Sequence, residues 1–205
     1  KAQSLASVAR AAYTTSMQIA DRKIGPGYPP LVIAEIGINH GGDLDVARHM
    51  VSLAAGAGAE IVKHQTHFVW DEMTEEAKSV LPPNAGGKSI WQVMEECALS
   101  PDEEAQLKAH AESLGVIFIS TPFSRAAADW LDEQDVPAFK IGSGEADHLP
   151  LIRHIAAKGK LGPGEMLAVD LATGDERWRF YADGPVPWLE AGVAGEILAQ
   201  MGWHR

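Results

Sequence analysis

The chain has 205 residues, of which 46% are hydrophobic and 22% charged, and this composition excludes a disordered, collagen-like or disulfide-scaffold protein. Its formal net charge of −11 disfavours non-specific binding to nucleic acid or anionic membranes, although a few converging lysines can still bind an anion locally. The single cysteine, Cys97, excludes an internal disulfide, and its helix-like surroundings predict a buried structural thiol. No apolar run reaches the roughly 18 residues of a membrane span.

Residues 1–23 differ in composition from the rest of the chain. They are rich in Ala and Ser, and their basic residues outnumber the single acid, Asp21. Either a transit peptide or a loosely held N-terminal helix has this composition, and the low arginine content favours the helix. The Gly- and Pro-rich residues 25–30 then end any helix.

From residue 31 onwards, short apolar runs alternate with amphipathic segments that begin at helix-capping residues. The runs predict strands over 31–36, 60–64, 116–120 and 138–141. The intervening segments predict helices over 44–55, 100–115, 124–134 and 150–158, and a long excursion occupies 65–99. This alternation predicts a parallel sheet covered by helices, as an open sheet or a barrel. Neither a dinucleotide fingerprint nor a P-loop occurs, which disfavours nucleotide binding.

Polar side chains follow each predicted strand at its carboxyl end, where β/α proteins bind their ligands. We therefore expect five residues to converge: Glu35, Lys63, Thr121, Lys140 and Ser143. Two lysines with hydroxyl groups suit a phosphate, or a phosphate with a carboxylate. Glu35 is expected to act as an acid/base, to hold substrate hydroxyls, or to serve only as the counter-ion of Lys63.

The histidines near these strands give weaker signals. His64 and His67 are poorly spaced for two metal ligands on one strand face, and a metal role is disfavoured without a third ligand. Asn39 and His40, in the first loop, either orient Glu35 or belong to a solvated turn.

Four stretches, in order, closely resemble the N-terminal half of bacterial sialic acid synthases. They are Ala-Glu-Ile-Gly-Ile-Asn-His at 34–40, Val-Lys-His-Gln-Thr-His at 62–67, Ser-Thr-Pro-Phe-Ser at 120–124 and Phe-Lys-Ile-Gly-Ser-Gly-Glu at 139–145. The resemblance covers about residues 23–160. The Lys-His-Gln-Thr-His form points to the N-acetylneuraminate or legionaminate branch rather than the pseudaminate branch.

The resemblance implies an α/β fold, a parallel β/α barrel of TIM type, in a cytoplasmic enzyme. The implied reaction condenses phosphoenolpyruvate with N-acetylmannosamine, or a related N-acetylated amino sugar, and releases phosphate. Glu35 would be the catalytic acid/base. The substrate-binding residues would be Lys63, Thr121, Lys140 and Ser143 on phosphoenolpyruvate, Gln65 beside it, and Asn84 on the amino sugar. A divalent metal, typically manganese and otherwise magnesium, would supply the electrophile.

The chain departs from the family pattern after about residue 160. The second half of the barrel and its two metal-binding histidines have no counterpart, so no metal ligand is predicted. The predicted organisation is an extension over 1–23, an incomplete barrel over 24–160 and a divergent tail over 161–205. Residues 166–180 resemble one repeat of a quinoprotein-like β-propeller and predict a hairpin, followed by a helix over 191–201.

Three functional hypotheses follow. The first is a synthase-like enzyme, and the second is a catalytically incomplete half barrel that binds phosphoenolpyruvate or another anion, or serves in assembly. The third is an aldolase-like enzyme that uses Lys63 or Lys140 as a Schiff-base lysine. Four or five strands cannot close an eight-stranded barrel, so the strand that ends at Ile141 should need cover from the tail hairpin or from another copy, and we expect a homo-oligomer or poor solubility. Because the implied metal ligands and further phosphoenolpyruvate ligands have no counterpart, we expect weak, salt-sensitive phosphoenolpyruvate binding and little or no condensation.

Overall fold

The computed structural model of the chain describes residues 17–24, 27–83, 85–145, 147–158, 165–169 and 176–181. The chain divides into two compact units. One is the continuous segment Leu31–Gly142, which contains most of the predicted site, and the other combines the residues before and after it.

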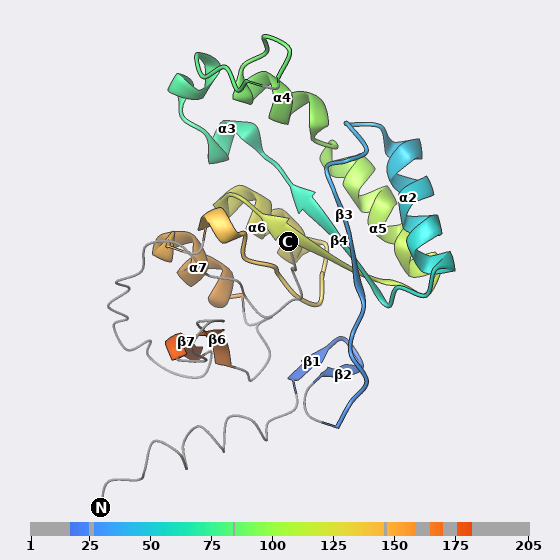
Figure 1. Ribbon diagram of the computed structural model, residues 1–205. Coiled ribbons are helices and arrows are strands. Elements are labelled where there is room, and N and C mark those ends of the chain that lie inside the picture. Colours follow the sequence, from blue (N-terminus) through green and yellow to red (C-terminus); the bar gives the residue numbers. More distant parts are fainter. Residues whose placement is uncertain are drawn as a thin grey trace, which may run out of the picture. The chain divides into compact units, whose positions relative to one another are not determined.

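A three-stranded parallel sheet forms the centre of the Leu31–Gly142 unit (Figure 1). Its strands are β3 (Ile33–Gly37), β4 (Ile61–Thr66) and β5 (Ile117–Pro122), in the order β3-β4-β5. This arrangement confirms the first three predicted strands and the α/β class with a parallel sheet. The described strands form an open sheet, so closure into a barrel stays a prediction.

Three capped helices pack around this sheet: α2 (Leu44–Gly56), α5 (Pro101–Ser113) and α6 (Arg125–Glu133). Each begins where the sequence places an N-cap, because the side chains of Asp43, Ser100 and Ser124 accept backbone N–H groups of the first turn. Buried apolar side chains of these helices and of the sheet include Ile36, Ala47, Val51, Val62, Leu107, Ala111, Phe118, Ala127, Ala128 and Leu131. The buried Ile61 and Ile119 lie on the same face of the sheet as Lys63.

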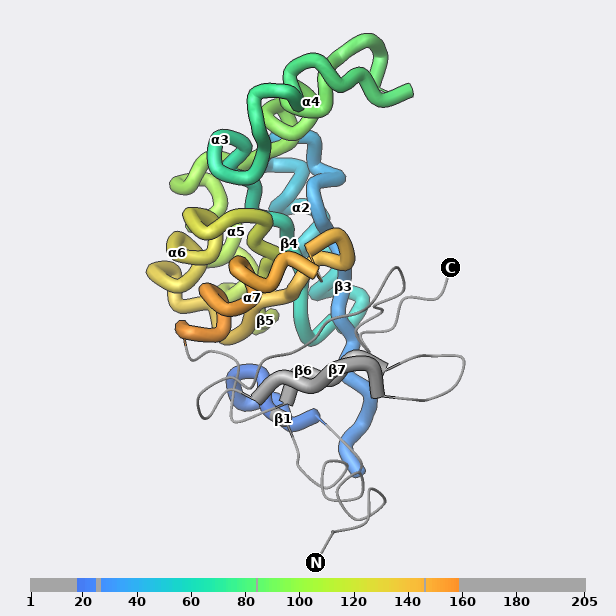
Figure 2. The backbone as a smooth tube through the Cα atoms, turned by 90° about the vertical axis from the view of Figure 1, so that its left-hand side faces the viewer, coloured from blue at the N-terminus to red at the C-terminus, as the bar shows by residue number. Residues whose placement is uncertain are grey.

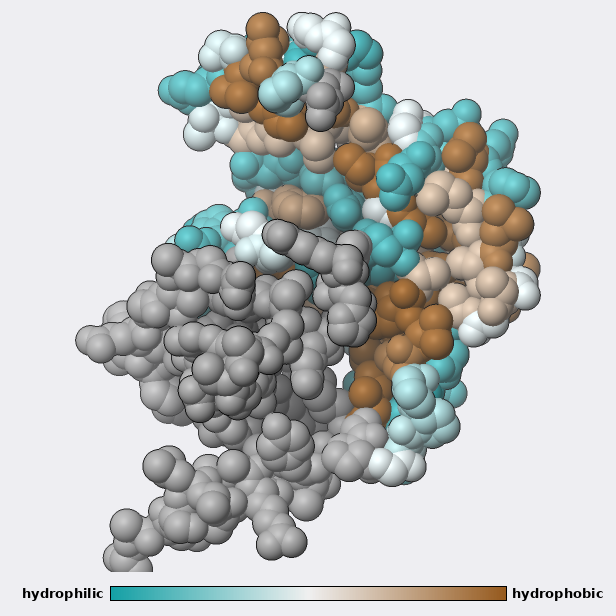
Figure 3. All heavy atoms as spheres, in the orientation of Figure 1, coloured by the Kyte–Doolittle hydropathy of each residue, from teal (hydrophilic) through white to brown (hydrophobic). Residues whose placement is uncertain are grey.

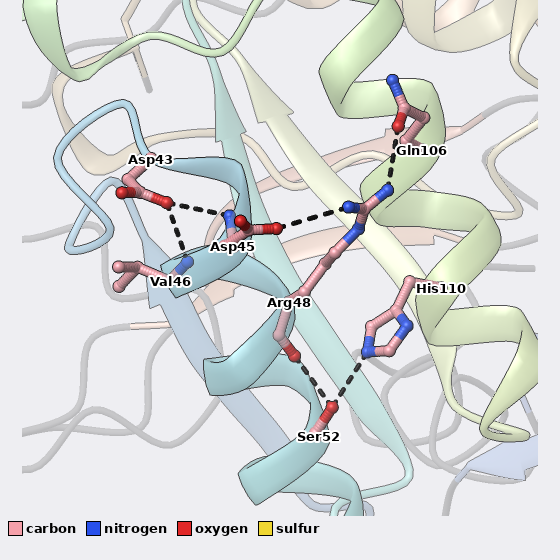
Figure 4. A network of polar contacts seen from close by, with 7 residues as sticks. All are labelled: Asp43, Asp45, Val46, Arg48, Ser52, Gln106 and His110. Carbon is pink, nitrogen blue, oxygen red and sulfur yellow. Dashed lines mark hydrogen bonds and ion pairs between the residues drawn. The ribbon is translucent and has the colours of Figure 1, made fainter.

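Helices α2 and α5 lie side by side, and polar contacts join them outside the core (Figure 4). Arg48 of α2 donates to Gln106 Oε1 of α5 at 2.8 Å, and Ser52 Oγ lies 2.9 Å from His110 Nε2. These contacts help to set how each helix is rotated about its own axis. They therefore help to keep the buried side of α5 against the sheet.

The excursion after β4 contains α3 (Val69–Glu72), the short 3₁₀ helix η1 (Glu75–Lys78) and α4 (Ile90–Cys97). It stands beyond the carboxyl end of β4 (Figures 1 and 2). Apolar side chains remain exposed on it, as on α2 (Figure 3), including Trp70 and Leu81 at 70% and 63% exposure. Cys97 is only half-buried at the end of α4, so the prediction of a buried thiol was wrong, because α4 packs little of its surface against the core.

The fourth predicted strand, over 138–141, is not a strand of this sheet. Phe139 makes one isolated parallel bridge to Ser120, and the Lys140 backbone N–H donates to the Ser120 carbonyl at 3.0 Å. Pro137 lacks an N–H and cannot extend the ladder towards its start. The single bridge is nevertheless enough to hold the backbone of Lys140 against the second half of β5.

The other unit contains two antiparallel hairpins and a short helix. Strands β1 (Met17–Ile19) and β2 (Arg22–Ile24) form the first hairpin, so the prediction of an N-terminal helix was wrong for residues 17–24. Strands β6 (Glu165–Val169) and β7 (Glu176–Tyr181) form the hairpin predicted in the tail. The chain between them includes η2 (Ser143–Glu145) and α7 (Leu149–Ala156).

The helix predicted over 191–201 lies outside the described residues, and the two predicted domain boundaries, after residues 23 and 160, stay predictions. Among the helices that the structure describes, none combines the length and the apolar character needed to cross a bilayer.

Gly41 and Gly42, in the turn between β3 and α2, provide a test of how this turn packs against α4. Both have positive φ, but a Cβ at Gly42 would lie 2.2 Å from the backbone oxygen of Glu96, whereas a Cβ at Gly41 would meet nothing within 4 Å. Gly41→Ala should lose about 1–2 kcal/mol of unfolding free energy through backbone strain alone. Gly42→Ala should lose about 3 kcal/mol or more, because α4 must also move. Urea denaturation of the two variants measures the difference, and equal losses would contradict this packing of the turn against α4.

Candidate functional site

The alternation of side chains along β4 separates two polar clusters on opposite faces of the sheet. Lys63 and Gln65 lie on one face, with Glu35 of β3 paired to Lys63 and Thr121 of β5 paired to Gln65 in the strand register. His64, the residue between them, lies on the other face, which α5 covers. The face with Lys63 is the one that the sequence analysis assigned to ligand binding.

Lys63 is buried, with 5% of its surface exposed, and it lies among partners from both neighbouring strands. Its Nζ is 2.5 Å from Glu35 Oε2 and donates to Thr121 Oγ1 at 3.2 Å. A buried ammonium group needs a compensating charge, and Glu35 supplies it in this state of the protein. The counter-ion role anticipated for Glu35 is therefore confirmed, and its role in catalysis stays a prediction.

Lys140 reaches the same charged cluster from the segment after β5. Burial lowers the pKa of Lys140 below its usual 10.5, the positive charge of Lys63 lowers it further, and Glu35 partly opposes the shift. The charges of Lys63, Lys140 and Glu35 thus influence one another, and the two lysines outnumber the carboxylate at this edge of the sheet. A bound anion would relieve their repulsion.

Gln65 connects this cluster to the end of β4. Its Nε2 donates to Glu35 Oε1 at 3.3 Å. Gly37 has a φ of +51°, and a Cβ there would lie 3.0 Å from Glu35 Oε1 and 3.2 Å from Gln65 Nε2. The absence of a side chain at Gly37 therefore leaves room for the contact between Glu35 and Gln65.

The structure brings Glu35, Lys63, Gln65, Thr121 and Lys140 together in the Leu31–Gly142 unit. The other two predicted site residues stay predictions. Ser143 begins η2 and belongs to the other compact unit. Asn84 lies outside the described residues.

On the opposite face of the sheet, two buried histidines form a directed chain of hydrogen bonds. The Gly42 N–H donates to His40 Nδ1 at 3.1 Å, so the neutral His40 ring carries its proton on Nε2. That Nε2 lies 3.1 Å from His64 Nε2, which must then accept, and His64 Nδ1 donates to Glu104 Oε1 at 2.9 Å. His40 is only 4% exposed, so the solvated-turn alternative was wrong for this residue. The hydrogen bonds of His40 go to Gly42 and His64 and that of Asn39 Nδ2 goes to the Ile36 carbonyl, so neither contact supports a role in orienting Glu35.

Hydroxyl groups extend this chain across β4 and β5. Thr66 Oγ1 donates to the same Glu104 oxygen and lies 2.7 Å from Ser120 Oγ. Sequence reasoning missed Glu104 because it was assigned to the acidic first turn of its helix. Its spacing from Leu107 and Ala111 puts it on the buried stripe of α5, and that spacing was the signal that could have revealed it.

The described residues do not fit the divalent metal that the resemblance implies. No group of three or more His, Cys, Asp or Glu side chains among them could hold a metal ion. His40 and His64 contact each other, and His67 contacts Glu72. Each ring nitrogen of these three histidines is therefore already engaged by a protein group.

The buried His40 predicts a pH dependence of stability. Burial, and then the neighbouring His64, lower the pKa of His40 from 6.5 to about 4. Between these values the unfolded chain binds a proton at His40 that the folded protein does not, so this residue destabilises the fold as pH falls from 6.5 to 4. The slope it contributes approaches about 1.4 kcal/mol per pH unit.

His40→Gln keeps a donor towards His64 but does not titrate in this range. Urea denaturation between pH 4 and 7 should give a shallower stability profile for this variant than for the wild type. Parallel profiles would show that His40 does not make the predicted contribution.

Comparisons with known proteins find the same family that the four sequence motifs resemble. The chain matches the NeuB family over residues 50–173. It is 33% identical to the human N-acetylneuraminate-9-phosphate synthase over 68% of this chain and 39% of that protein. It is 35% identical to the N,N'-diacetyllegionaminic acid synthase of Campylobacter jejuni over 63% of this chain and 40% of that protein.

A crystal structure of a sialic acid synthetase from Leptospira borgpetersenii, in complex with citrate, superposes with a TM-score of 0.59 at 27% identity. The alignment covers 71% of this chain and 47% of that one. The chain spans about 40% of the length of the curated relatives that it matches. The family match covers more than half of the chain, and the chain belongs to the NeuB family.

Proposed function

We propose that this chain acts in the synthesis of a nonulosonic acid, by condensing phosphoenolpyruvate with N-acetylmannosamine or a related N-acetylated amino sugar and releasing phosphate. The observation that carries the proposal is the buried Lys63, held at 2.5 Å from Glu35, with Lys140 near enough for its pKa to be lowered by the charge of Lys63 as well as by burial. Relatives named as sialic and legionaminic acid synthases support the reaction class. We further propose that the Leu31–Gly142 unit is part of a TIM-type barrel, which the similar synthetase structure supports.

We expect the anion to bind beside Lys63 and Lys140, where two positive side chains face one carboxylate, Glu35. Phosphoenolpyruvate carries about three negative charges at neutral pH, since the second pKa of a phosphate is near 6. Lys63 and Lys140 would offset most of that charge, and the Thr121 hydroxyl and Ser143 would donate to the oxygens. Binding would also offset the charge of Lys63, which, after burial, is the second cause of the lowered pKa of Lys140.

Glu35 and the substrate anion would compete for Lys63. Before binding, the lysine holds Glu35 as a carboxylate at 2.5 Å. Once Lys63 turns to the phosphate or carboxylate of phosphoenolpyruvate, Glu35 is released to move a proton at the sugar aldehyde. Attack of the phosphoenolpyruvate C3 on that aldehyde makes its oxygen an alkoxide and leaves C2 electron-poor. A water molecule would add to C2 and give a proton to Glu35, which would pass it to the alkoxide to form the hydroxyl group of the product. The C2–O bond to the phosphate would then break, and the C2 hydroxyl proton would leave with the phosphate as the 2-keto acid forms. Gln65 and Asn84 would face the sugar.

We also propose that the chain forms a homo-oligomer. Among the described residues, the outer edge of β5 carries one isolated bridge, at Ser120, and leaves most of its backbone groups available to a further strand. A second copy of the chain would cover this edge. Sedimentation velocity measures the oligomeric state, and a monomer at high concentration would contradict this part of the proposal.

The anion site predicts a salt-sensitive affinity for phosphoenolpyruvate that depends on Lys140. Lys140→Ala should weaken binding about 10- to 100-fold at low salt, since charge-assisted hydrogen bonds contribute about 1.5–3 kcal/mol. Lys63→Ala should weaken it at least as much. Lys88→Ala is the matched control, because Lys88 is half exposed and paired with Glu96. Calorimetry measures all three variants, and an unchanged affinity in Lys140→Ala would exclude this anion site.

A condensation assay, run with and without manganese, separates the competing hypotheses. Phosphate release that requires both phosphoenolpyruvate and the amino sugar supports the synthase. Binding without phosphate release supports the incomplete, anion-binding half barrel, which the named relatives do not favour. The lowered pKa of Lys140 also suits a Schiff-base lysine, and borohydride trapping of a carbonyl substrate on Lys140 would indicate that chemistry instead.

A further inference from the structure

The proposed acid/base Glu35 stands at the end of a line of hydrogen bonds that begins outside the predicted site. Glu72, in α3, lies with both carboxylate oxygens 3.0 Å from His67 Nδ1. His67 Nε2 lies 3.3 Å from Gln65 Oε1, and Gln65 Nε2 donates to Glu35 Oε1 at 3.3 Å. The side chains of His67 and Glu72 are 3% and 5% exposed, so water hardly competes for the contact between these two residues.

The donors and acceptors of this line have one consistent assignment. Gln65 must turn its amide nitrogen towards the Glu35 carboxylate, because its carbonyl oxygen would meet another acceptor there. Its oxygen therefore faces His67 Nε2, which must carry a proton. One more proton, held on His67 Nδ1 or on the Glu72 carboxyl group, completes the contact between that pair. In either form the His67–Glu72 pair has no net charge and presents an N–H to Gln65.

Neighbouring elements hold both members of the pair in place. The His67 ring stacks on Phe123, just after β5, with the ring centroids 4.4 Å apart and the planes inclined by 12°. Asp71, next to Glu72 in α3, accepts the backbone N–H of Ala126 in the first turn of α6 at 2.9 Å. The imidazole can neither rotate freely nor lose its carboxylate partner without displacing α3.

We propose that His67 and Glu72 are positioning residues of this site. They fix the Gln65 amide so that it donates to Glu35, and so they set the orientation of the carboxylate that faces the bound anion and the sugar. The role assigned to Glu35 rests on the proposed function, but the orientation of Gln65 does not. The hydrogen bonds and the ring contact of His67 among the described residues go to Glu72, Gln65 and Phe123 rather than to either lysine, so its substitution should leave phosphoenolpyruvate affinity largely unchanged.

Two substitutions at position 67 separate positioning from a structural role. His67→Gln keeps an N–H donor near the place of Nε2, towards Gln65, and His67→Asn keeps one near the place of Nδ1, towards Glu72. Solvent exchange of the Gln65 side-chain amide, followed by NMR in protein with ¹⁵N-labelled glutamine, should be slow in the wild type and in His67→Gln. It should be faster in His67→Asn by on the order of tenfold, the effect of losing one hydrogen bond.

If His67 serves only to pair with Glu72, the order of the two variants reverses, with His67→Asn retained and His67→Gln impaired, and the proposal is overturned. Wild-type protein gives a further test that does not depend on the folding of a variant. The ¹⁵N shift of His67 Nε2 should be that of a protonated nitrogen, and an unprotonated Nε2 would also overturn the proposal.

Phosphoenolpyruvate affinity, measured on the same samples, distinguishes failure of this inference from failure of the proposed function. Unchanged affinity in His67→Asn with faster amide exchange is the expected result. If neither the wild type nor any variant binds phosphoenolpyruvate, the proposed function fails. The exchange rate of the Gln65 side-chain amide still decides how Gln65 is oriented. If all three proteins exchange alike and bind alike, the positioning role fails and the anion site stands.

Discussion

The burial of Lys63 in the middle of the sheet is the constraint on which the rest of the site depends. A lysine ammonium group with 5% exposure is unstable without a negative partner, and Glu35 meets that need at 2.5 Å from the neighbouring strand. This pairing requires β3 and β4 to be parallel and in the observed register, with Glu35 opposite Lys63. A shift of one residue would turn Glu35 to the other face of the sheet. The ion pair and the strand register therefore depend on each other.

The same strand, β4, carries a second polar cluster on its other face. His64 and Thr66 meet Glu104 of α5, so this helix is joined to the sheet by a buried carboxylate as well as by apolar contacts. A buried carboxylate is tolerated when several donors satisfy it, and each donor must come from a fixed direction. The hydrogen bonds of His64 and Thr66 to Glu104 therefore specify how α5 lies on the sheet. They also hold β4 in place, the strand that carries Lys63 and Gln65 on its other face.

The excursion between β4 and α5 has a role that its irregular secondary structure does not suggest. It returns Glu72 to the end of β4, where this residue meets His67. It also packs the end of α4 against the turn at Gly42, close in sequence to His40. The connection that follows β4 therefore contacts both the end of its own strand and the turn that follows β3, and a change within it should affect both faces of the sheet.

The sequence by itself determined the three strands, their parallel arrangement, the capped helices and the convergence of Glu35, Lys63, Thr121 and Lys140. These features follow from local patterns, because apolar runs, N-caps and polar residues at strand ends are all legible along the chain. Gln65 was assigned to the same edge through the family resemblance, and the structure places it there against Glu35.

Only the tertiary structure decided the partners of the buried polar groups and the extent of the fourth strand. Glu104 meets His64 from 40 residues away, and no local pattern encodes which donor reaches a buried carboxylate. His40 looked like a loop residue until α5 and β4 enclosed it. Residues 138–141 have the apolar pattern of a strand, yet they make one bridge to β5, because Pro137 has no N–H and cannot extend the ladder towards its start.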